Sequence, residues 1–297
     1  MFSGSMAAIV TPMNAEGGLD WPAWDRLLDF HVREGTDGIV VAGTTGESPV
    51  LSTEEIEELT GRAVARCRGK LKVIVGSGTH STAGTVARTR TLSRLGVDAV
   101  MLVTPYYNKP PQEGLYRHFM AATDASQAPV ILYNVPSRTA VDLLPGTIAR
   151  LARNPQIVAV KDATGSLNRA REVLSACPPG FTLLSGDDAT AVDLMDLGAR
   201  GVISVSANVA PRRMREACEA AVSGDLARAR TIDASLQPLH RDLFVESSPI
   251  PVKWAVARMG LIGNAIRLPL VELSSAHQDT VLRAMQAAGV ILEDQAA

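Results

Sequence analysis

Eight short apolar runs, separated by segments with helical periodicity, constrain the fold of this chain more than any other feature. Each run is rich in Val and Ile and nearly unbroken in hydrophobicity, which is typical of strands buried on both faces. They cover residues 7–11, 38–43, 73–76, 99–104, 130–135, 157–162, 181–186 and 201–206. Eight strands that alternate with helices predict a parallel sheet.

The intervening segments carry helix signals. In segment 53–67 apolar residues share one helical face, and Ser52 and Glu55 have the spacing of a capping box. A second helix is predicted from Ser81 to Gly96. A weak repeat places a glycine three residues before three of the strands, at Gly35, Gly96 and Gly198, where it suits a left-handed helix end.

A helix-ending turn that recurs before several strands indicates a ring of similar units, and eight units make a (β/α)8 TIM barrel, an α/β fold. The alternative is an open doubly wound sheet. However, the segment GSGTHS at 76–81 lacks the third glycine of a dinucleotide fingerprint, and the chain has no Walker A motif.

Strand signals stop near residue 225. The segments 225–244, 249–259 and 273–288 then read as three helices. We therefore predict a catalytic barrel over residues 1–224 and a C-terminal helical domain over 225–297, as an appendage or an oligomer interface.

Composition excludes several classes of protein. The net charge is −2, so no electrostatic reason favours nucleic acid or an anionic membrane as a partner. Hydrophobic residues make up 46%, which rules out a disordered chain. No apolar run approaches the roughly 18 residues of a membrane span. The three cysteines form no CxxC pair and no signal peptide precedes them, so we expect a reduced, cytoplasmic protein.

In a (β/α)8 barrel the catalytic groups sit at the C-terminal ends of the strands, and there Lys161 is the most informative residue. Strand alternation places it on the same face as Ala159 and Ile157. If that face lines the barrel, burial favours an uncharged amine that attacks a carbonyl. The alternative, which stays open, is that the Lys161 side chain extends from the end of the strand into solvent and not into the barrel.

Polar residues at other strand ends each allow one functional and one purely structural interpretation. Thr44 and Thr45 lie in the loop GTTG, which suits a bound carboxylate or an ordinary turn. Tyr133 fits a proton shuttle or a core tyrosine. Arg138 fits a carboxylate-binding fork or a surface arginine.

Metal chemistry and serine-triad chemistry lack support. The five histidines form no HxH or HxxxH pair, so no metal site is expected. Adjacent carboxylates such as Asp187 and Asp188 point different ways, and Asp187 suits the cap of a helix. The chain has no GxSxG elbow.

Three motifs, GTTGE at 43–47, YNVPSR at 133–138 and VKDATG at 160–165, resemble the dihydrodipicolinate synthase family. The resemblance runs from MFSGSMAAIVTPM through LVTPYYNKP and LLSGDDA to FVESSPIPVKWA, so it covers nearly the whole chain. It implies a class I aldolase-like lyase that joins pyruvate to aspartate semialdehyde in lysine and diaminopimelate synthesis. It also implies no metal or organic cofactor and a homotetramer built as a dimer of dimers.

The resemblance implies roles for individual residues. Lys161 forms the Schiff base with pyruvate, and a proton relay consists of Tyr133, Thr44 and a Tyr107 that reaches in from a neighbouring subunit. The substrate-binding residues are Thr45 for the pyruvate carboxylate, Arg138 for the semialdehyde carboxylate, and Gly186 and Ile203 through backbone atoms.

Many family members are inhibited by lysine, at a site near Ser48, His80 and Tyr106. In sensitive relatives a glutamate typically stands at the position of Gly84, and histidine is frequent at the position of Ile56. A lysine ammonium group without a counter-charge is costly to bury. The resemblance therefore implies weak or absent lysine inhibition here.

Two rival functions stay open. Sialic acid lyases and keto-deoxy-sugar aldolases share the lysine and tyrosine positions, although Arg138 favours a small acidic aldehyde. A non-catalytic carboxylate sensor on the same barrel would have no need of the lysine together with the relay.

Overall fold

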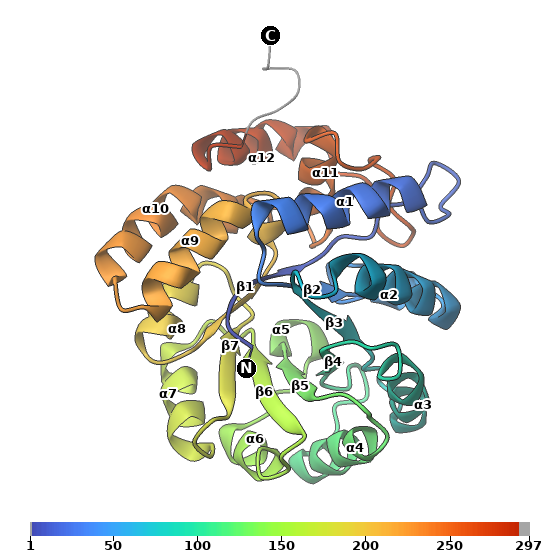
Figure 1. Ribbon diagram of the computed structural model, residues 1–297, viewed down its shortest axis with the longest axis vertical. Helices are drawn as coiled ribbons and strands as arrows, with labels where there is room; N and C mark the ends of the chain where they lie inside the picture. Colours follow the sequence, from blue (N-terminus) through green and yellow to red (C-terminus); the bar gives the residue numbers. More distant parts are fainter. Residues whose placement is uncertain (1, 291–297) are drawn as a thin grey trace.

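The computed structural model describes residues 2–290, and in this range eight parallel strands form a closed barrel in sequential order. Figure 1 shows the strands at the centre of a ring of helices. The strands are β1 (Gly4–Ala8), β2 (Gly38–Val41), β3 (Lys72–Gly76), β4 (Ala99–Val103), β5 (Val130–Asn134), β6 (Ile157–Asp162), β7 (Thr182–Ser185) and β8 (Gly201–Ser204). β1 pairs in parallel with both β2 and β8, which closes the sheet. The predicted (β/α)8 fold is confirmed, and the open sheet is excluded.

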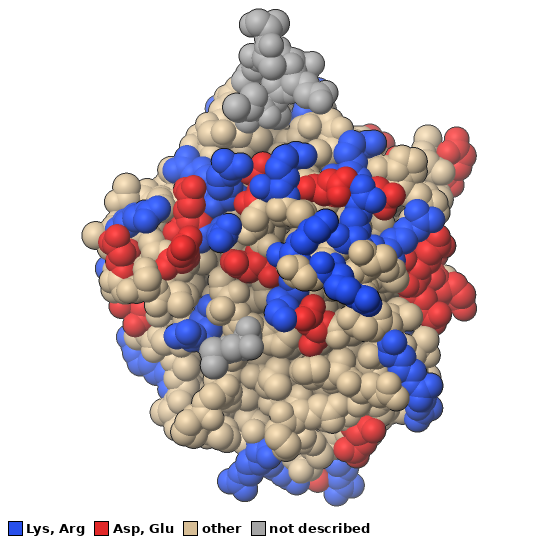
Figure 2. Space-filling view, viewed as in Figure 1, with Lys and Arg blue, Asp and Glu red and all other residues tan. Residues whose placement is uncertain are grey.

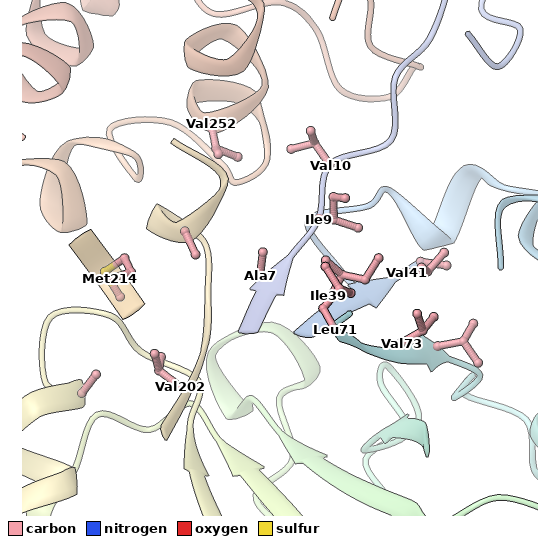
Figure 3. Packing of buried hydrophobic residues seen from close by; sticks show 14 of the residues in the cluster. Ala7, Ile9, Val10, Ile39, Val41, Leu71, Val73, Val202, Met214 and Val252 are labelled. Atoms are coloured by element: carbon pink, nitrogen blue, oxygen red, sulfur yellow. The ribbon is translucent and has the colours of Figure 1, made fainter. Parts of the chain in front are cut away.

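Seven of the predicted strands begin within one residue of the observed start, but the first does not. It was expected at 7–11 and lies at Gly4–Ala8. Ile9 and Val10 beyond it are fully buried in the hydrophobic cluster that also includes Val252 of a C-terminal helix, which lies near Val10 in Figure 3. The apolar residues after β1 therefore indicate burial, although they do not belong to the strand.

Helices and short turns connect the strands, and most of the helices cover the outside of the barrel. They are α1 (Trp21–Glu34), α2 (Thr53–Cys67), α3 (Thr82–Leu92), α4 (Gln112–Asp124), α5 (Pro136–Thr139), α6 (Pro145–Leu151), α7 (Leu167–Ala176), α8 (Ala191–Asp196) and α9 (Pro211–Val222), with short 3-10 turns η1 (Ser48–Val50) and η2 (Ser206–Asn208). The capping box of α2 is present as predicted, since Ser52 and Glu55 exchange hydrogen bonds. α3 ends at Leu92, four residues before the predicted end.

The repeated glycines have the predicted left-handed conformation. The φ angles are 76° at Gly35, 80° at Gly96 and 116° at Gly198. A residue with a Cβ atom is strained at such angles, so glycine allows the chain to turn sharply from a helix into the next strand.

Three further helices follow the barrel: α10 (Leu226–Asp242), α11 (Ile250–Arg258) and α12 (Ser275–Ala287). α10 packs against α9 and α12, and α12 packs against α11. In the view of Figure 1, α11 and α12 are drawn above α1. The buried residues of these three C-terminal helices, such as Leu236, Val252 and Met285, belong to the same hydrophobic cluster as the outer face of the barrel. The domain division at 224/225 stays a prediction, and residues 291–297 of the predicted second domain lie outside the described residues.

The core has two layers. The interior of the barrel is filled from alternate strand positions, including Val40, Ile74, Ile131 and Ala159. The second layer, between strands and helices, is larger, and Figure 3 shows part of it around β1 and β2. Each strand is therefore buried on both faces, as its unbroken hydrophobicity predicted.

One predicted side-chain direction is wrong. Ile157 was expected on the face of Lys161 but packs in the outer layer, whereas Ala159 faces the interior. The register between β5 and β6 shifts here, because Val130 pairs with Ile157 and Ile131 with Ala159. An extra residue in one strand of a pair reverses which side-chain positions face the interior and which face outward in the part of that strand before the extra residue. The direction predicted for Lys161 is unaffected.

On the face shown in Figure 2, Lys and Arg side chains are interspersed with Asp and Glu side chains. Several form ion pairs between neighbouring helices, such as Arg66 of α2 with Asp29 of α1 at 2.5 Å. Cys67, Cys177 and Cys218 are free thiols, in agreement with the predicted absence of disulfides. Among the helices of residues 2–290, none is both long and apolar enough to cross a membrane.

Candidate active site

Lys161 lies in β6 near its C-terminal end, with its side chain directed into the barrel. The residue is 5% exposed. Within residues 2–290 its Nζ has neither an ion-pair partner nor a hydrogen-bond partner. The amine contacts the face of the Tyr133 ring, at 4.3 Å from the ring centroid. The interior direction predicted from strand alternation is therefore observed.

Tyr133 is the register neighbour of Lys161 on β5. Its ring belongs to the interior cluster with Ile131 and Val135, because alternate residues of a strand face the same side. The residue is 5% exposed. Two neighbouring strands thus present an amine and a phenol side by side at the same end of the barrel.

A cavity of about 440 Å³ opens above these two residues. Thr44 and Thr45 line it from the loop after β2, and no described residue hydrogen-bonds to either hydroxyl. Gly186 lines it after β7. A Cβ atom on Gly186 would lie 2.7 Å from the Ala163 Cβ and 3.0 Å from the Lys161 Cε, so only glycine leaves room beside the amine.

Arg138 closes another side of this cavity. It belongs to α5, the short helix that follows β5. Its Nη2 donates to the Ser248 carbonyl at 3.3 Å, and no carboxylate pairs with it within residues 2–290. The guanidinium therefore remains available to an anion in the cavity.

Two predicted site residues do not line the cavity. Ile203 lies in the interior cluster, and Val205 supplies the wall from the β8 side instead. Tyr107 is 91% exposed and lies in the loop after β4. Its φ angle of 75° is unusual for a residue with a side chain. Within residues 2–290, Tyr107 does not line this cavity and forms no hydrogen bond with Tyr133 or Thr44.

Comparisons with known proteins agree along nearly the whole chain. The model of the dihydrodipicolinate synthetase family matches residues 1–288. A 4-hydroxy-tetrahydrodipicolinate synthase of Stutzerimonas stutzeri is 53% identical over 98% of this chain and 100% of its own. The chain belongs to the dihydrodipicolinate synthetase family.

Solved structures of this family have the same fold. The chloride-inhibited enzyme of Acinetobacter baumannii, complexed with pyruvate, is 46% identical with a TM-score of 0.96, over 98% of this chain and 100% of that chain. The enzyme of Cyanidioschyzon merolae with lysine bound is 36% identical with a TM-score of 0.94, over 98% and 99%. The family and the lyase activity predicted from the motifs are confirmed.

Behind the site, a polar network joins the ends of the strands that carry the amine and the phenol. Asn134 of β5 donates to Asp142 at 2.9 Å and to Asp162 of β6 at 3.0 Å. Arg169 pairs with Asp142 at 2.6 Å and holds the pKa of that carboxyl below its ordinary value. No sequence pattern predicted this network, because its members come from four different segments and follow no fixed spacing.

Asp187 and Asp188 point in different directions, as predicted, but Asp187 is not a helix cap. Its carboxylate accepts from Thr190 N–H and Oγ1, one turn before α8 begins at Ala191. Asp188 is buried and accepts from the N–H groups of Val205 and Ser206. Within residues 2–290, His, Cys, Asp and Glu side chains form no group of three that could hold a metal.

A second cavity, of about 450 Å³, adjoins the first and shares Thr44, Val135 and Arg138 with it. It brings together Ser48, His80 and Tyr106, the three residues predicted for a lysine site. The His80 and Tyr106 rings meet edge to face, 5.3 Å apart.

Arg88 also lines the second cavity, which the sequence analysis missed. No carboxylate pairs with Arg88 within the described range. Gly84 and the fully buried Ile56 are not part of the lining. The lining of this chain thus contributes cations and no carboxylate.

Proposed function

We propose that this lyase joins pyruvate to L-aspartate 4-semialdehyde through a Schiff base on Lys161. The observation that carries the proposal is the difference between two buried lysines. Lys253 is 1% exposed and pairs with Glu47, whereas Lys161 borders a cavity and has no ion-pair or hydrogen-bond partner within residues 2–290. A lysine that attacks a carbonyl needs a free amine beside the space for the substrate, and of these two lysines Lys161 meets that condition.

The chemistry follows from that amine. Lys161 attacks the pyruvate ketone, and loss of water leaves an imine. The imine withdraws electrons more strongly than the ketone, so a methyl proton leaves and an enamine forms. The enamine carbon attacks the aldehyde of the second substrate. The amino group of that substrate then attacks the imine carbon, which closes the ring and releases Lys161.

Proton transfers require a group next to the amine, and Tyr133 is in contact with it. We assign Tyr133, Thr44 and Tyr107 to a proton relay, with Tyr107 supplied by a neighbouring subunit. An exposed ring on a left-handed backbone is poorly explained in a single chain, and burial against a second copy would account for it. A homotetramer built as a dimer of dimers fits this assignment.

The two carboxylates have separate binding groups. Thr45 and the backbone of its loop hold the pyruvate carboxylate, while Arg138 holds the carboxylate of the semialdehyde. Gly186 admits pyruvate next to the amine because it lacks a Cβ atom. Ile203 is assigned a backbone contact in the same pocket. A cytoplasmic location stays a prediction.

Borohydride treatment in the presence of pyruvate should reduce the imine and fix one pyruvate on Lys161. Peptide mass mapping gives the position of the adduct. Lys253 is the internal control, because its ion pair with Glu47 keeps it from reacting. An adduct on any other lysine, or no adduct, would refute the mechanism. The control variant Lys161→Ala should fold normally and form none.

Arg138→Ala should raise the KM for the semialdehyde and lower kcat/KM. A hydrogen bond to a charged group contributes about 1.5–3 kcal/mol, which corresponds to roughly tenfold to hundredfold. Pyruvate adduct formation should change little, because pyruvate binds before and apart from this contact. If the kinetics with the semialdehyde and the formation of the pyruvate adduct are impaired equally, Arg138 organises the cavity instead. Steady-state kinetics with each substrate varied in turn separates the two results.

Tyr107 can be tested by mixing two inactive variants. Tyr107→Phe lacks the relay hydroxyl, and Lys161→Ala lacks the amine. In a mixed dimer the site that keeps Lys161 receives an intact Tyr107 from the partner. Random exchange of subunits should therefore restore about a quarter of the wild-type activity. No recovery after exchange, or a fully active monomer in sedimentation, would contradict the assignment in trans.

Lysine should inhibit weakly or not at all, because the second cavity offers Arg88 and Arg138 but no carboxylate for an ammonium group. A dose–response curve at saturating pyruvate measures this. We expect half-inhibition above about 1 mM, equivalent to a binding free energy weaker than about −4.1 kcal/mol. Inhibition well below this concentration would mean that groups outside this lining bind lysine.

A further inference from the structure

An ion pair between Glu47 and Lys253 is buried beside the active site. The side chains are 1% and 2% exposed. Glu47 ends the loop after β2, and Lys253 lies in α11, 206 residues further along the chain. Figure 3 shows Val252, the neighbour of Lys253, close to Val10 beyond the end of β1. The pair thus connects the C-terminal helices to the end of the barrel that holds the cavity.

The groups around Glu47 orient its carboxylate. One oxygen accepts from Lys253 Nζ, and the other accepts from the Arg267 N–H at 3.3 Å. The Arg267 guanidinium is held elsewhere, by Glu55 and by the carbonyls of Gly17 and Val50. Burial lowers the pKa of Lys253, and the charge of Glu47 opposes that shift.

Glu47 controls the backbone of the loop that carries Thr44 and Thr45. Its φ angle is 59°, a conformation that a residue with a side chain adopts only when held. Its N–H donates to the Thr44 carbonyl at 3.1 Å. Thr11 Oγ1 donates to the Gly46 carbonyl at 2.7 Å. A displaced Glu47 carboxylate would therefore shift the turn that holds both hydroxyls.

Lys253 acts on the opposite wall of the cavity. Its N–H donates to the Pro249 carbonyl at 2.9 Å, in the first turn of α11. Ser247 and Ser248, just before this turn, line the cavity, and the Ser248 carbonyl accepts from Arg138. The pair therefore links the wall of Thr44 and Thr45 to the wall that contacts Arg138.

Stability alone gives little reason for this pair. Desolvation of two charges offsets much of their attraction, and apolar residues of similar size often stabilise such a position equally well. An ion pair is directional, so it holds a loop in one arrangement better than apolar residues do.

We propose that Glu47 and Lys253 are positioning residues, which hold the Thr44–Thr45 loop in the geometry that binds the pyruvate carboxylate. This inference rests on the proposed function, because it assumes that pyruvate binds at this loop. Neither residue borders the cavity, so neither is a catalytic residue.

The test compares Glu47→Gln, Lys253→Met and the double variant. For each, the melting temperature and the pyruvate concentration that gives half-maximal borohydride trapping are measured. Each single variant leaves one buried charge unpaired, so both readouts should worsen. The double variant removes both charges. Its melting temperature should recover most of the loss, while half-maximal trapping should still require roughly tenfold more pyruvate, or about 1.4 kcal/mol.

If the double variant recovers pyruvate binding together with stability, the pair is only structural and the proposal is wrong. If a single variant fails to fold, the double variant still decides. Leu236→Ala, in the fully buried face of α10, is the matched control. It should lower the melting temperature without changing the pyruvate requirement. Wild-type protein that traps no pyruvate on Lys161 would refute the proposed function, and this inference with it.

Discussion

Closure of the sheet by β1 and β8 is the constraint on which the rest of the structure depends. The two strands pair over four register positions, from Gly4 with Gly201 to Ala7 with Ser204. Their backbones approach so closely that a Cβ atom on Gly201 would lie 2.1 Å from the Gly4 carbonyl oxygen. Because the sheet closes with all strands parallel, their C-terminal ends converge at one end, where the cavity lies.

Two buried lysines, the reactive Lys161 and the structural Lys253, differ in whether an opposite charge is buried with them. Among residues 2–290 two lysines are buried, and within this range a carboxylate pairs with only one of them. Lys253 is held by Glu47 and joins two parts of the fold. Lys161 is left against the Tyr133 ring, with an open cavity in front of it. The same side chain thus has opposite roles because its surroundings differ.

The cavity wall comes from several loops, and each loop is held from outside the cavity. Thr11 and Glu47 hold the loop after β2, and the Asn134–Asp142–Arg169 network holds the ends of β5 and β6. Pre-organised side chains need little rearrangement when substrate binds. The exposed Tyr107 is the exception, since nothing within the described chain covers its ring.

The sequence alone determined the number of strands and the position of seven of them, the capping box of α2, the family and the interior direction of Lys161, because local periodicity and short motifs carry this information. It did not determine the partner of Lys253, the network behind Lys161, the contribution of Arg88, or the true register of β6. Each of these depends on residues that only chain closure brings together, such as Glu47 and Lys253, which lie 206 positions apart. Side-chain pairing at such distances along the chain has no fixed spacing, so tertiary packing alone decides it.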